Sequence, residues 1–418
     1  MLKRELRAWL IVAVLFTDVG FIFGGTLSTP GIFFAPLIRE FGWSHARVSS
    51  LASALTLGTI PGSVAAGFLL ERVELRIPIV AGAILTACSL LVTSHLNSYL
   101  PLLISNFFAG FGVGMATLLP AAAVIASWFQ ARRGTAMGTA IAGVSVGGMI
   151  MVQLVTAVNR THGWRVGYEA LAAPVLLIVI PLVLLVVRNR PTDPEPDRGG
   201  ADDGPRSDLY LAGLDLASAV GARSFWLIAI ASFLFAFTVY GILTQLVLHL
   251  LGIGYRPAQA AIALSLVLGL NAAGKVLFGV VADSIGARLS LAISFALIAC
   301  GLIVLLGFRQ RIGMAIFILI YGPAWGAPLM LLPLITIESL GLKHYPSLGG
   351  VLRVPEAIGA MLGPVVLGRI FDLSRSYYPA FGLCVFCSIM AATTTLGCTE
   401  FNTDSIIEAE RLPTVGTS

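Results

Sequence analysis

The chain has 418 residues, of which 57% are hydrophobic and 11% are charged, and its net charge is +5. Soluble domains carry roughly 25% charged residues, so an ordinary soluble fold is excluded and the lipid bilayer must act as part of the solvent. No dense basic block is present, which argues against a nucleic-acid surface. The apolar runs are about 20 residues long, the length of a membrane-spanning helix rather than of a barrel strand.

The apolar runs predict an all-α membrane protein with twelve transmembrane helices. In chain order, the expected spans are 8–37, 47–70, 77–95, 99–128, 133–158, 167–187, 224–250, 257–282, 288–308, 312–337, 346–370 and 377–398. The first run resembles a signal peptide, but it is too long and carries Asp18, so we interpret it as a retained span.

Residues 188–223 are rich in Pro, Asp, Arg and Gly and are typical of a flexible, solvated linker. The predicted domains are a six-helix bundle at 1–188, a cytoplasmic linker at 189–222, a second six-helix bundle at 223–398 and a cytoplasmic tail at 399–418. Outside the spans, 15 Lys and Arg residues fall on the side of the termini and 9 on the other side. This bias predicts a multi-pass protein of the plasma membrane with both termini in the cytoplasm.

The two halves of the sequence repeat each other. Gly67 recurs as Gly279, 212 positions later, and the Leu-Leu-Pro that ends at Pro120 recurs as the one ending at Pro333, 213 positions later. Such a duplication in so apolar a chain predicts a transporter made of two pseudo-symmetric bundles.

The repeated glycines open two charged loops, one after span two and one after span eight. Both loops resemble the signature loop of the major facilitator superfamily, in which a glycine permits close helix packing and charged side chains pair or cap helix ends. We expect these loops to control the change between conformations. The gating residues predicted here and before span five are Gly67, Glu71, Arg72, Gly279, Asp283, Arg288, Arg132 and Arg133.

Four charged residues fall inside predicted spans and away from the span ends: Asp18, Lys275, Arg353 and Glu356. A charge at this depth costs several kcal/mol or more, so each is expected to face a partner or a watery cavity. Arg353 and Glu356 are three residues apart and share a helix face, so they can form a buried pair. Pro355 lies between them and makes the same helix easy to bend, as a gating helix requires.

Lys275 has no carboxylate within four residues on its own helix. The residue one turn earlier, at position i−4, is Asn271, which is neutral. The counter-ion of Lys275 is therefore expected from another span, as Asp18 or Glu356, or from an anionic substrate. Either carboxylate could carry a proton, and the alternative for Asp18 is a hydrogen bond to a neighbouring helix. Tyr321 and Trp325 lie one turn apart and could flank a small planar ligand. The predicted substrate-binding residues are Lys275, Arg353, Asn271, Tyr321 and Trp325.

The stretch from Trp128 to Gly143 resembles the span-five signature of the monocarboxylate transporter family. Span eight resembles that family around Lys275, where the family has a substrate-binding arginine, and span eleven does so at 355–359. The resemblance implies the major facilitator fold and a small anionic substrate. Asn271 stands where the family often has an acid, and Ser28 where animal members have a proton-coupling lysine.

The sequence therefore predicts a secondary active transporter of a small monocarboxylate such as lactate or pyruvate, with proton symport by alternating access. The alternatives are an organic-anion exchanger similar to oxalate–formate antiporters, export of an amphipathic compound, or a non-transporting accessory or sensor subunit. The expected partners are a small organic anion, a proton and the bilayer, with the chain monomeric or weakly associated. No nucleophile–base set, metal cluster or phosphate loop is recognisable, so neither an enzyme nor a cofactor is expected.

Overall fold

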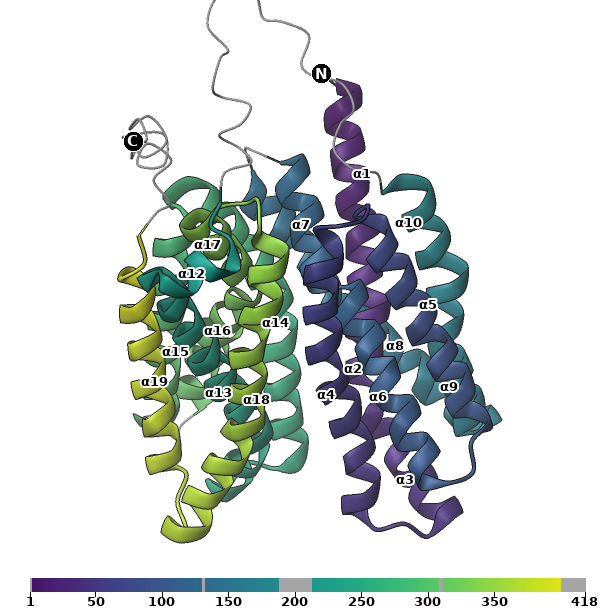
Figure 1. The fold of residues 1–418 in the computed structure, drawn as a ribbon. Helices are drawn as coiled ribbons and strands as arrows, with labels where there is room; N and C mark the ends of the chain where they lie inside the picture. The colour runs from purple at the N-terminus through teal and green to yellow at the C-terminus, as the bar shows by residue number, and fades with distance from the viewer. Residues whose placement is uncertain (1, 130–131, 188–212, 308–310, 400–418) are drawn as a thin grey trace, which may run out of the picture.

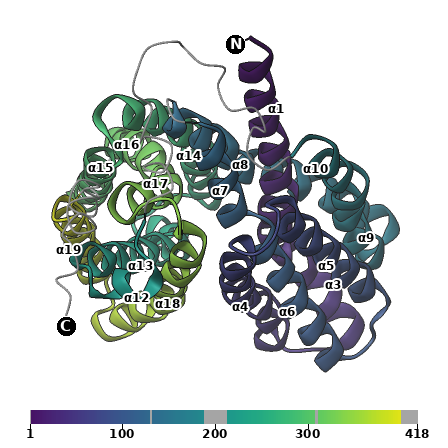
Figure 2. The same cartoon turned by 45° about the horizontal axis from the view of Figure 1, so that its top comes forward.

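The computed structural model describes residues 2–129, 132–187, 213–307 and 311–399. Within these residues, twelve helical stretches are long and apolar enough to cross a membrane. The helices form two groups that stand side by side, one from each half of the chain (Figures 1 and 2). The predicted all-α fold with two six-helix bundles is thus confirmed.

The first six spans contain α1 (Leu2–Asp18), the π-helix η1 (Val19–Gly25), α2 (Thr26–Ser28), α3 (Pro30–Phe41), α4 (His45–Leu70), α5 (Arg76–His95), α6 (Tyr99–Ala116), α7 (Leu118–Trp128), α8 (Arg133–His162), α9 (Trp164–Pro174), the π-helix η2 (Val175–Val179) and α10 (Ile180–Val186). The second half contains α12 (Leu216–Gly221), α13 (Arg223–Gly252), α14 (Pro257–Ile285), α15 (Ala287–Gly307), α16 (Arg311–Gly326), α17 (Pro328–Leu340), α18 (Tyr345–Ser374) and α19 (Tyr378–Leu396).

Most of the predicted linker, and the tail after Thr399, lie outside the described residues. From Gly213 onward the linker is folded. Gly213 pairs with Gly341 through an isolated antiparallel bridge, and Asp215 caps α12 by accepting a hydrogen bond from the backbone of Ser218. The segment 213–222 is therefore part of the second bundle rather than a flexible linker, because it is bonded to the loop before α18.

The sequence repeat corresponds to a broken helix in each half. Span four is interrupted at Thr117, between α6 and α7, and span ten is interrupted at Ala327, between α16 and α17. Pro120 lies in the first turn of α7 and Pro328 begins α17. A proline lacks an N–H and its ring clashes with the carbonyl four residues earlier, so each proline favours the start of a new helix at this point.

The two halves meet at the end of the bundle where both chain termini emerge, which we call the terminal face (Figure 1). Gly67 of α4 packs directly on the backbone of Pro346 in α18, and Gly279 of α14 packs on the backbone of Gly134 in α8. In each case a Cβ would collide with the facing carbonyl oxygen. Gly67 and Gly279 are 212 positions apart, and so are Gly134 and Pro346. The same contact thus occurs twice, related by the repeat.

Charged contacts at the opposite face stay within one half, as far as the described residues go. There, Trp164 Nε1 donates to Glu40 at 2.5 Å and Arg165 pairs with the same carboxylate at 2.7 Å. All of these side chains belong to the first bundle. A contact that does join the two halves, between Glu71 and His344, lies at the terminal face instead.

Candidate functional site

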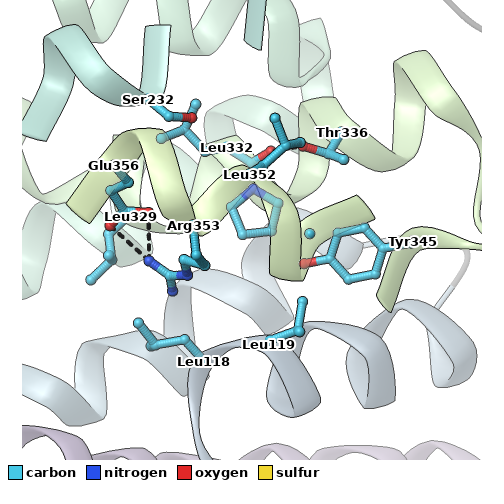
Figure 3. A pocket seen from close by; sticks show the side chains of 12 residues that line it. Leu118, Leu119, Ser232, Leu329, Leu332, Thr336, Tyr345, Leu352, Arg353 and Glu356 are labelled. Carbon is cyan, nitrogen blue, oxygen red and sulfur yellow. Dashed lines mark hydrogen bonds and ion pairs between the residues drawn. The ribbon is translucent and has the colours of Figure 1, made fainter. Parts of the chain in front are cut away.

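A pocket lies between the two halves at the level of the broken helices. Its empty volume is about 410 Å³, including space open to solvent. Two of the lining residues, Leu118 and Leu119, come from α7, and the others belong to the second half (Figure 3). The second-half residues are Ser232, Leu329, Leu332, Pro333, Thr336, Tyr345, Gly349, Leu352, Arg353 and Glu356.

Arg353 and Glu356 form an ion pair inside this pocket. Arg353 Nη1 donates to Glu356 Oε1 at 2.7 Å and to Oε2 at 2.6 Å, as the dashed lines in Figure 3 show. Their side chains are only 18% and 14% exposed. The pairing predicted from their spacing on one helix is confirmed, and it places one cation and one anion at the centre of the pocket.

Lys275 is buried at the junction between the halves, with 2% of its surface exposed. Its Nζ donates to Ser145 Oγ on α8 at 3.0 Å, and Ser145 Oγ donates to Asn271 Oδ1 at 3.2 Å. Neither Asp18 nor Glu356 is its hydrogen-bond partner in this conformation, and the alternative, an anionic substrate as counter-ion, stays a prediction. Gly138 of α8 packs directly on the backbone of Lys275, so the two helices approach closely beside the lysine. Lys275 and Asn271 lie outside the pocket lining.

Ser145 was missed by the sequence reasoning. It lies among glycines in span five, and a serine in such a run ordinarily bonds to its own helix backbone. Only the packing of α8 on α14 reveals it as the partner of a buried ammonium.

Asp18 is fully buried, and neither carboxylate oxygen has a hydrogen-bond partner in the described part of the chain. The alternative interpretation of Asp18, a hydrogen bond to a neighbouring helix, is therefore not seen among the described residues. Asp18 ends α1, and the π-helix η1 follows at once. Single π-helical turns inside spanning helices often occur at functional positions. Asp18 lies outside the pocket lining, whereas Glu356 is part of it.

Tyr321 and Trp325 are packed in the core of the second half. Their ring centroids are 6.2 Å apart, and Tyr321 stacks on Phe317 at 4.9 Å. Tyr321 is 2% exposed and also contacts Gly301 of α15. Neither ring lines the pocket in this conformation.

Asp283 links the end of α14 to the beginning of α8. Its carboxylate accepts hydrogen bonds from the backbone nitrogens of Gly134 at 2.6 Å and Thr135 at 2.9 Å, and from Thr135 Oγ1 at 2.5 Å. The first N–H groups of a helix have no partner within the helix and carry partial positive charge. A carboxylate of the second half therefore caps a helix of the first half.

The repeat-related contact uses Glu71 and His344. His344 is the N-cap of α18, and its Nδ1 lies 3.5 Å from Glu71 Oε1. His344 is 212 positions after Arg132, the N-cap of α8. We call Asp283–Thr135 and Glu71–His344 the terminal-face contacts. Asp283, at the end of span eight, contacts the start of span five. Glu71, at the end of span two, contacts the start of span eleven.

The remaining predicted gating residues bond within their own halves or face solvent. Arg133 donates to the backbone oxygens of Phe129 and Ala126, and Arg288 donates to that of Cys398. Arg72 is exposed at the end of α4. Arg132 is 3.9 Å from Glu5, and both side chains are largely exposed.

The sequence pattern of the Major Facilitator Superfamily matches residues 19–364. Monocarboxylate transporter 3 of Rattus norvegicus is 26% identical over 408 residues, which is 95% of this chain and 81% of the relative. Monocarboxylate transporter 1 of Homo sapiens is 23% identical over 413 residues, covering 90% of this chain and 81% of the relative.

Solved structures show the same fold. The proton:xylose symporter XylE superposes with a TM-score of 0.73 over 95% of this chain and 97% of its own, at 16% identity. The fucose:proton symporter FucP of E. coli superposes with a TM-score of 0.69 over 93% of this chain and 98% of its own, also at 16% identity.

Proposed function

Since this chain belongs to the major facilitator superfamily and is a multi-pass membrane transporter, we propose that it carries a small monocarboxylate across the plasma membrane together with a proton. The relatives named as monocarboxylate transporters support this choice of cargo. The observation that carries the proposal is the pocket between the halves, whose charged lining residues are Arg353 and Glu356.

Arg353 is suited to bind a carboxylate without first releasing Glu356. Both of its bonds to Glu356 come from Nη1. A guanidinium has five N–H donors, and paired N–H groups match the two oxygens of a carboxylate. Within the described residues, Nε and Nη2 of Arg353 make no hydrogen bond. They supply a free donor edge for the substrate.

Charge balance couples the proton to the substrate. The Arg353–Glu356 pair is neutral, so a bound carboxylate would leave one uncompensated negative charge at membrane depth. Such a charge costs several kcal/mol when the site closes away from water. A proton on Glu356 restores neutrality. The loaded site can then close, whereas the site with anion alone closes far less readily.

Lys275 and Asp18 serve other steps in this proposal. Ser145 holds the Lys275 ammonium in the present conformation. In this proposal a rearrangement of α8 against α14 makes the ammonium available to the carboxylate beside Asn271 when Asp18 gives up its proton, so that the charges of the loaded site still sum to zero. Asp18 has no partner among the described residues, and an ionised, unpaired carboxylate at that depth would be costly. We therefore assign a bound proton to Asp18 in this conformation and treat it as the second proton-coupling residue.

The terminal-face contacts hold the halves together on one side of the membrane. Transport then requires Asp283 and Glu71 to release the starts of α8 and α18 so that the bundles rock about the pocket. The bias of Lys and Arg toward this side supports the proposal that it faces the cytoplasm. In this proposal one chain, alone or weakly associated, is sufficient.

The test is uptake of labelled lactate and pyruvate into proteoliposomes with an acid exterior. We expect accumulation that depends on the pH gradient and that Arg353→Gln abolishes. Arg369→Gln, on the exposed side of the same helix, is the matched control and should transport as wild type does. Uptake that ignores the gradient but requires internal carboxylate would replace symport with organic-anion exchange. Absence of counterflow for every acid would contradict the proposal.

A further inference from the structure

The two terminal-face contacts differ in the groups that meet the acid. At the start of α8, Asp283 accepts hydrogen bonds from the backbone nitrogens of Gly134 and Thr135 and from the Thr135 hydroxyl. A backbone N–H and a hydroxyl keep the same charge across the physiological pH range. The donors in this contact are therefore indifferent to pH.

The start of α18 lacks the same set of donors. The positions equivalent to the two donor residues of α8, 212 positions later, are Pro346 and Ser347. Proline has no N–H, and the Ser347 hydroxyl donates to the backbone oxygen of His344 at 3.0 Å. Within the described residues, Glu71 accepts no hydrogen bond from this backbone. Its charged contact is with the imidazole of His344, whose Nδ1 lies 3.5 Å from Oε1 of Glu71.

This contact lies at the end of a closely packed seam between α4 and α18. Gly67 of α4 packs on the backbone of Pro346, and a Cβ on Gly350 of α18 would come within 3.1 Å of a backbone oxygen of α4. The side chains of His344 and Glu71 are 31% and 27% exposed. Solvent therefore reaches the imidazole while the seam holds it beside the carboxylate, and their attraction acts on the closing of the seam.

A second carboxylate lies near the same imidazole, in the segment before α12. Asp215 belongs to the folded end of the linker, where the backbone nitrogen of Leu214 donates to the backbone oxygen of Leu340 at 2.9 Å. Hydrogen bonds from Ser218 lower the pKa of Asp215, and the positive charge of His344 adds to this effect. His344 thus has a negative charge near it from each half of the chain.

The other charges around His344 are a weaker influence. The partial positive charge at the start of α18 disfavours a cation at its N-cap and favours an anion such as Glu71 beside it. The remaining charged groups on the packed elements are exposed or bonded elsewhere. They are the exposed Arg72 and Lys343, Glu338 of α17, which accepts a hydrogen bond from the backbone of Ala287, and Arg353, which pairs with Glu356 in the pocket.

From this arrangement we propose that His344 makes closure of the terminal face depend on pH. Imidazole is the side chain that changes charge between about pH 5 and 8. In acid, His344 is a cation and forms an ion pair with Glu71 across the seam, which favours the closed face. At higher pH the imidazole is neutral and this attraction is lost. The donors to Asp283 keep their charge throughout, so one of the two terminal-face contacts responds and the other does not.

The consequence for transport rests on the function proposed above, in which the terminal face is cytoplasmic and protons enter with the substrate. Protonation of His344 from the cytoplasm stabilises the state that is closed on that side. The carrier then opens to the cytoplasm less often. Protons that have entered thereby slow further entry.

The first experiment measures the separation of the halves in purified protein without substrate. Spin labels replace Glu74 and Ser284 in a variant without the five native cysteines. Between pH 8 and pH 6, the ratio of closed to open terminal faces should rise about two- to fivefold beyond any change in His344→Gln. His344→Arg should keep the acid value at both pH values. His95→Gln, at an exposed position at the end of α5, is the matched control and should respond as wild type does.

The second experiment measures pyruvate counterflow in proteoliposomes with the same pH on both sides. His344→Arg should be about two- to fivefold slower than wild type at pH 8 and equal to it at pH 6. Glu71→Gln should remove the difference between His344→Arg and His344→Gln, because the cation has then lost its partner across the seam.

The two experiments separate this proposal from the function on which its consequence rests. An identical pH response of the distances in wild type and His344→Gln would show that the imidazole does not control closure, and the proposal would be wrong even if pyruvate is transported. Equal counterflow of His344→Arg and wild type at pH 8 would likewise contradict it. Absence of any counterflow would remove the proposed function, and the distances, which need no substrate, would still decide whether His344 controls closure.

Discussion

The carboxylate of Asp283 accepts a hydrogen bond from the backbone nitrogen of Thr135 at 2.9 Å, although the two residues are 148 positions apart. The end of span eight in one bundle thereby caps the beginning of span five in the other. Glu71 approaches the N-cap of α18 in the repeat-related position. Two acids that the sequence placed in equivalent loops thus contact the starts of two helices, each in the opposite half.

Asp283→Asn should weaken this closure, because an amide can accept fewer of the three hydrogen bonds and no longer complements the helix dipole. The expected loss is about 1–3 kcal/mol, which shifts the balance between closed and open terminal faces by roughly 5- to 150-fold. Spin labels at Arg72 and Ser284, in a variant without the five native cysteines, report the separation of the halves there. A longer average distance is expected.

Glu74→Gln is the matched control for Asp283→Asn. Glu74 pairs with Arg76 at 2.7 Å on the exposed surface of the first half alone, so its loss should leave the distance distribution unchanged. An identical distribution for wild type and Asp283→Asn would show that the carboxylate does not hold the halves together.

Ser145→Ala should destabilise the protein and weaken substrate binding, because the Lys275 ammonium loses its hydrogen-bond partner at the junction of α8 and α14. A hydrogen bond to a charged group contributes about 1.5–3 kcal/mol. Thermal unfolding in detergent should show a lower Tm, and transport should show a higher KM. Ser145→Thr retains the hydroxyl and should restore both. An unchanged Tm and KM in Ser145→Ala would contradict this role.

Asp18→Asn tests whether Asp18 holds a proton in the observed conformation. If it does, an amide of nearly the same shape replaces a neutral acid, and Tm should change by only a few degrees. An ionised Asp18 with no partner would instead carry a large desolvation cost, and its removal would raise Tm strongly. Asp372→Asn, at an exposed position near the end of α18, controls for the loss of a carboxylate alone.

Glu40 makes a pH-dependent contribution to stability at the face opposite the termini. The hydrogen bond from Trp164 Nε1, with help from Arg165, lowers the pKa of Glu40. Its stabilising contribution is therefore complete above the ordinary glutamate pKa, near 4.3, and is lost as pH falls through the lowered value. Because the carboxylate is 38% exposed, solvent screening limits the effect to about 0.5 kcal/mol.

The measurement is the difference in Tm between wild type and Glu40→Gln at pH 7 and at pH 3.5. Wild type should be slightly more stable at pH 7, and the difference should shrink in acid. A difference that widens as pH falls would have the wrong sign for a lowered pKa.

The fold followed from the sequence because bilayer thickness fixes the length of each span and the repeat fixes how the spans group. The Arg353–Glu356 pair was also predictable, since both residues lie on one face of one helix. The partner of Lys275 was not, because Ser145 reaches it only through the close approach of α8 at Gly138. The offset of 212 positions relates Gly134 to Pro346. Only the packing shows that Gly279 contacts Gly134 and that Gly67 contacts Pro346.

The most direct test of the central claim is carboxylate uptake and internal pH, measured together in proteoliposomes that contain wild type or Glu356→Gln. Wild type should accumulate labelled pyruvate when the exterior is acid, with internal acidification that rises with uptake. Glu356→Gln should still exchange the acid at equal concentrations on both sides, but should not accumulate it along the pH gradient. Gradient-driven accumulation by Glu356→Gln at the wild-type level would contradict coupling through the Arg353–Glu356 pair.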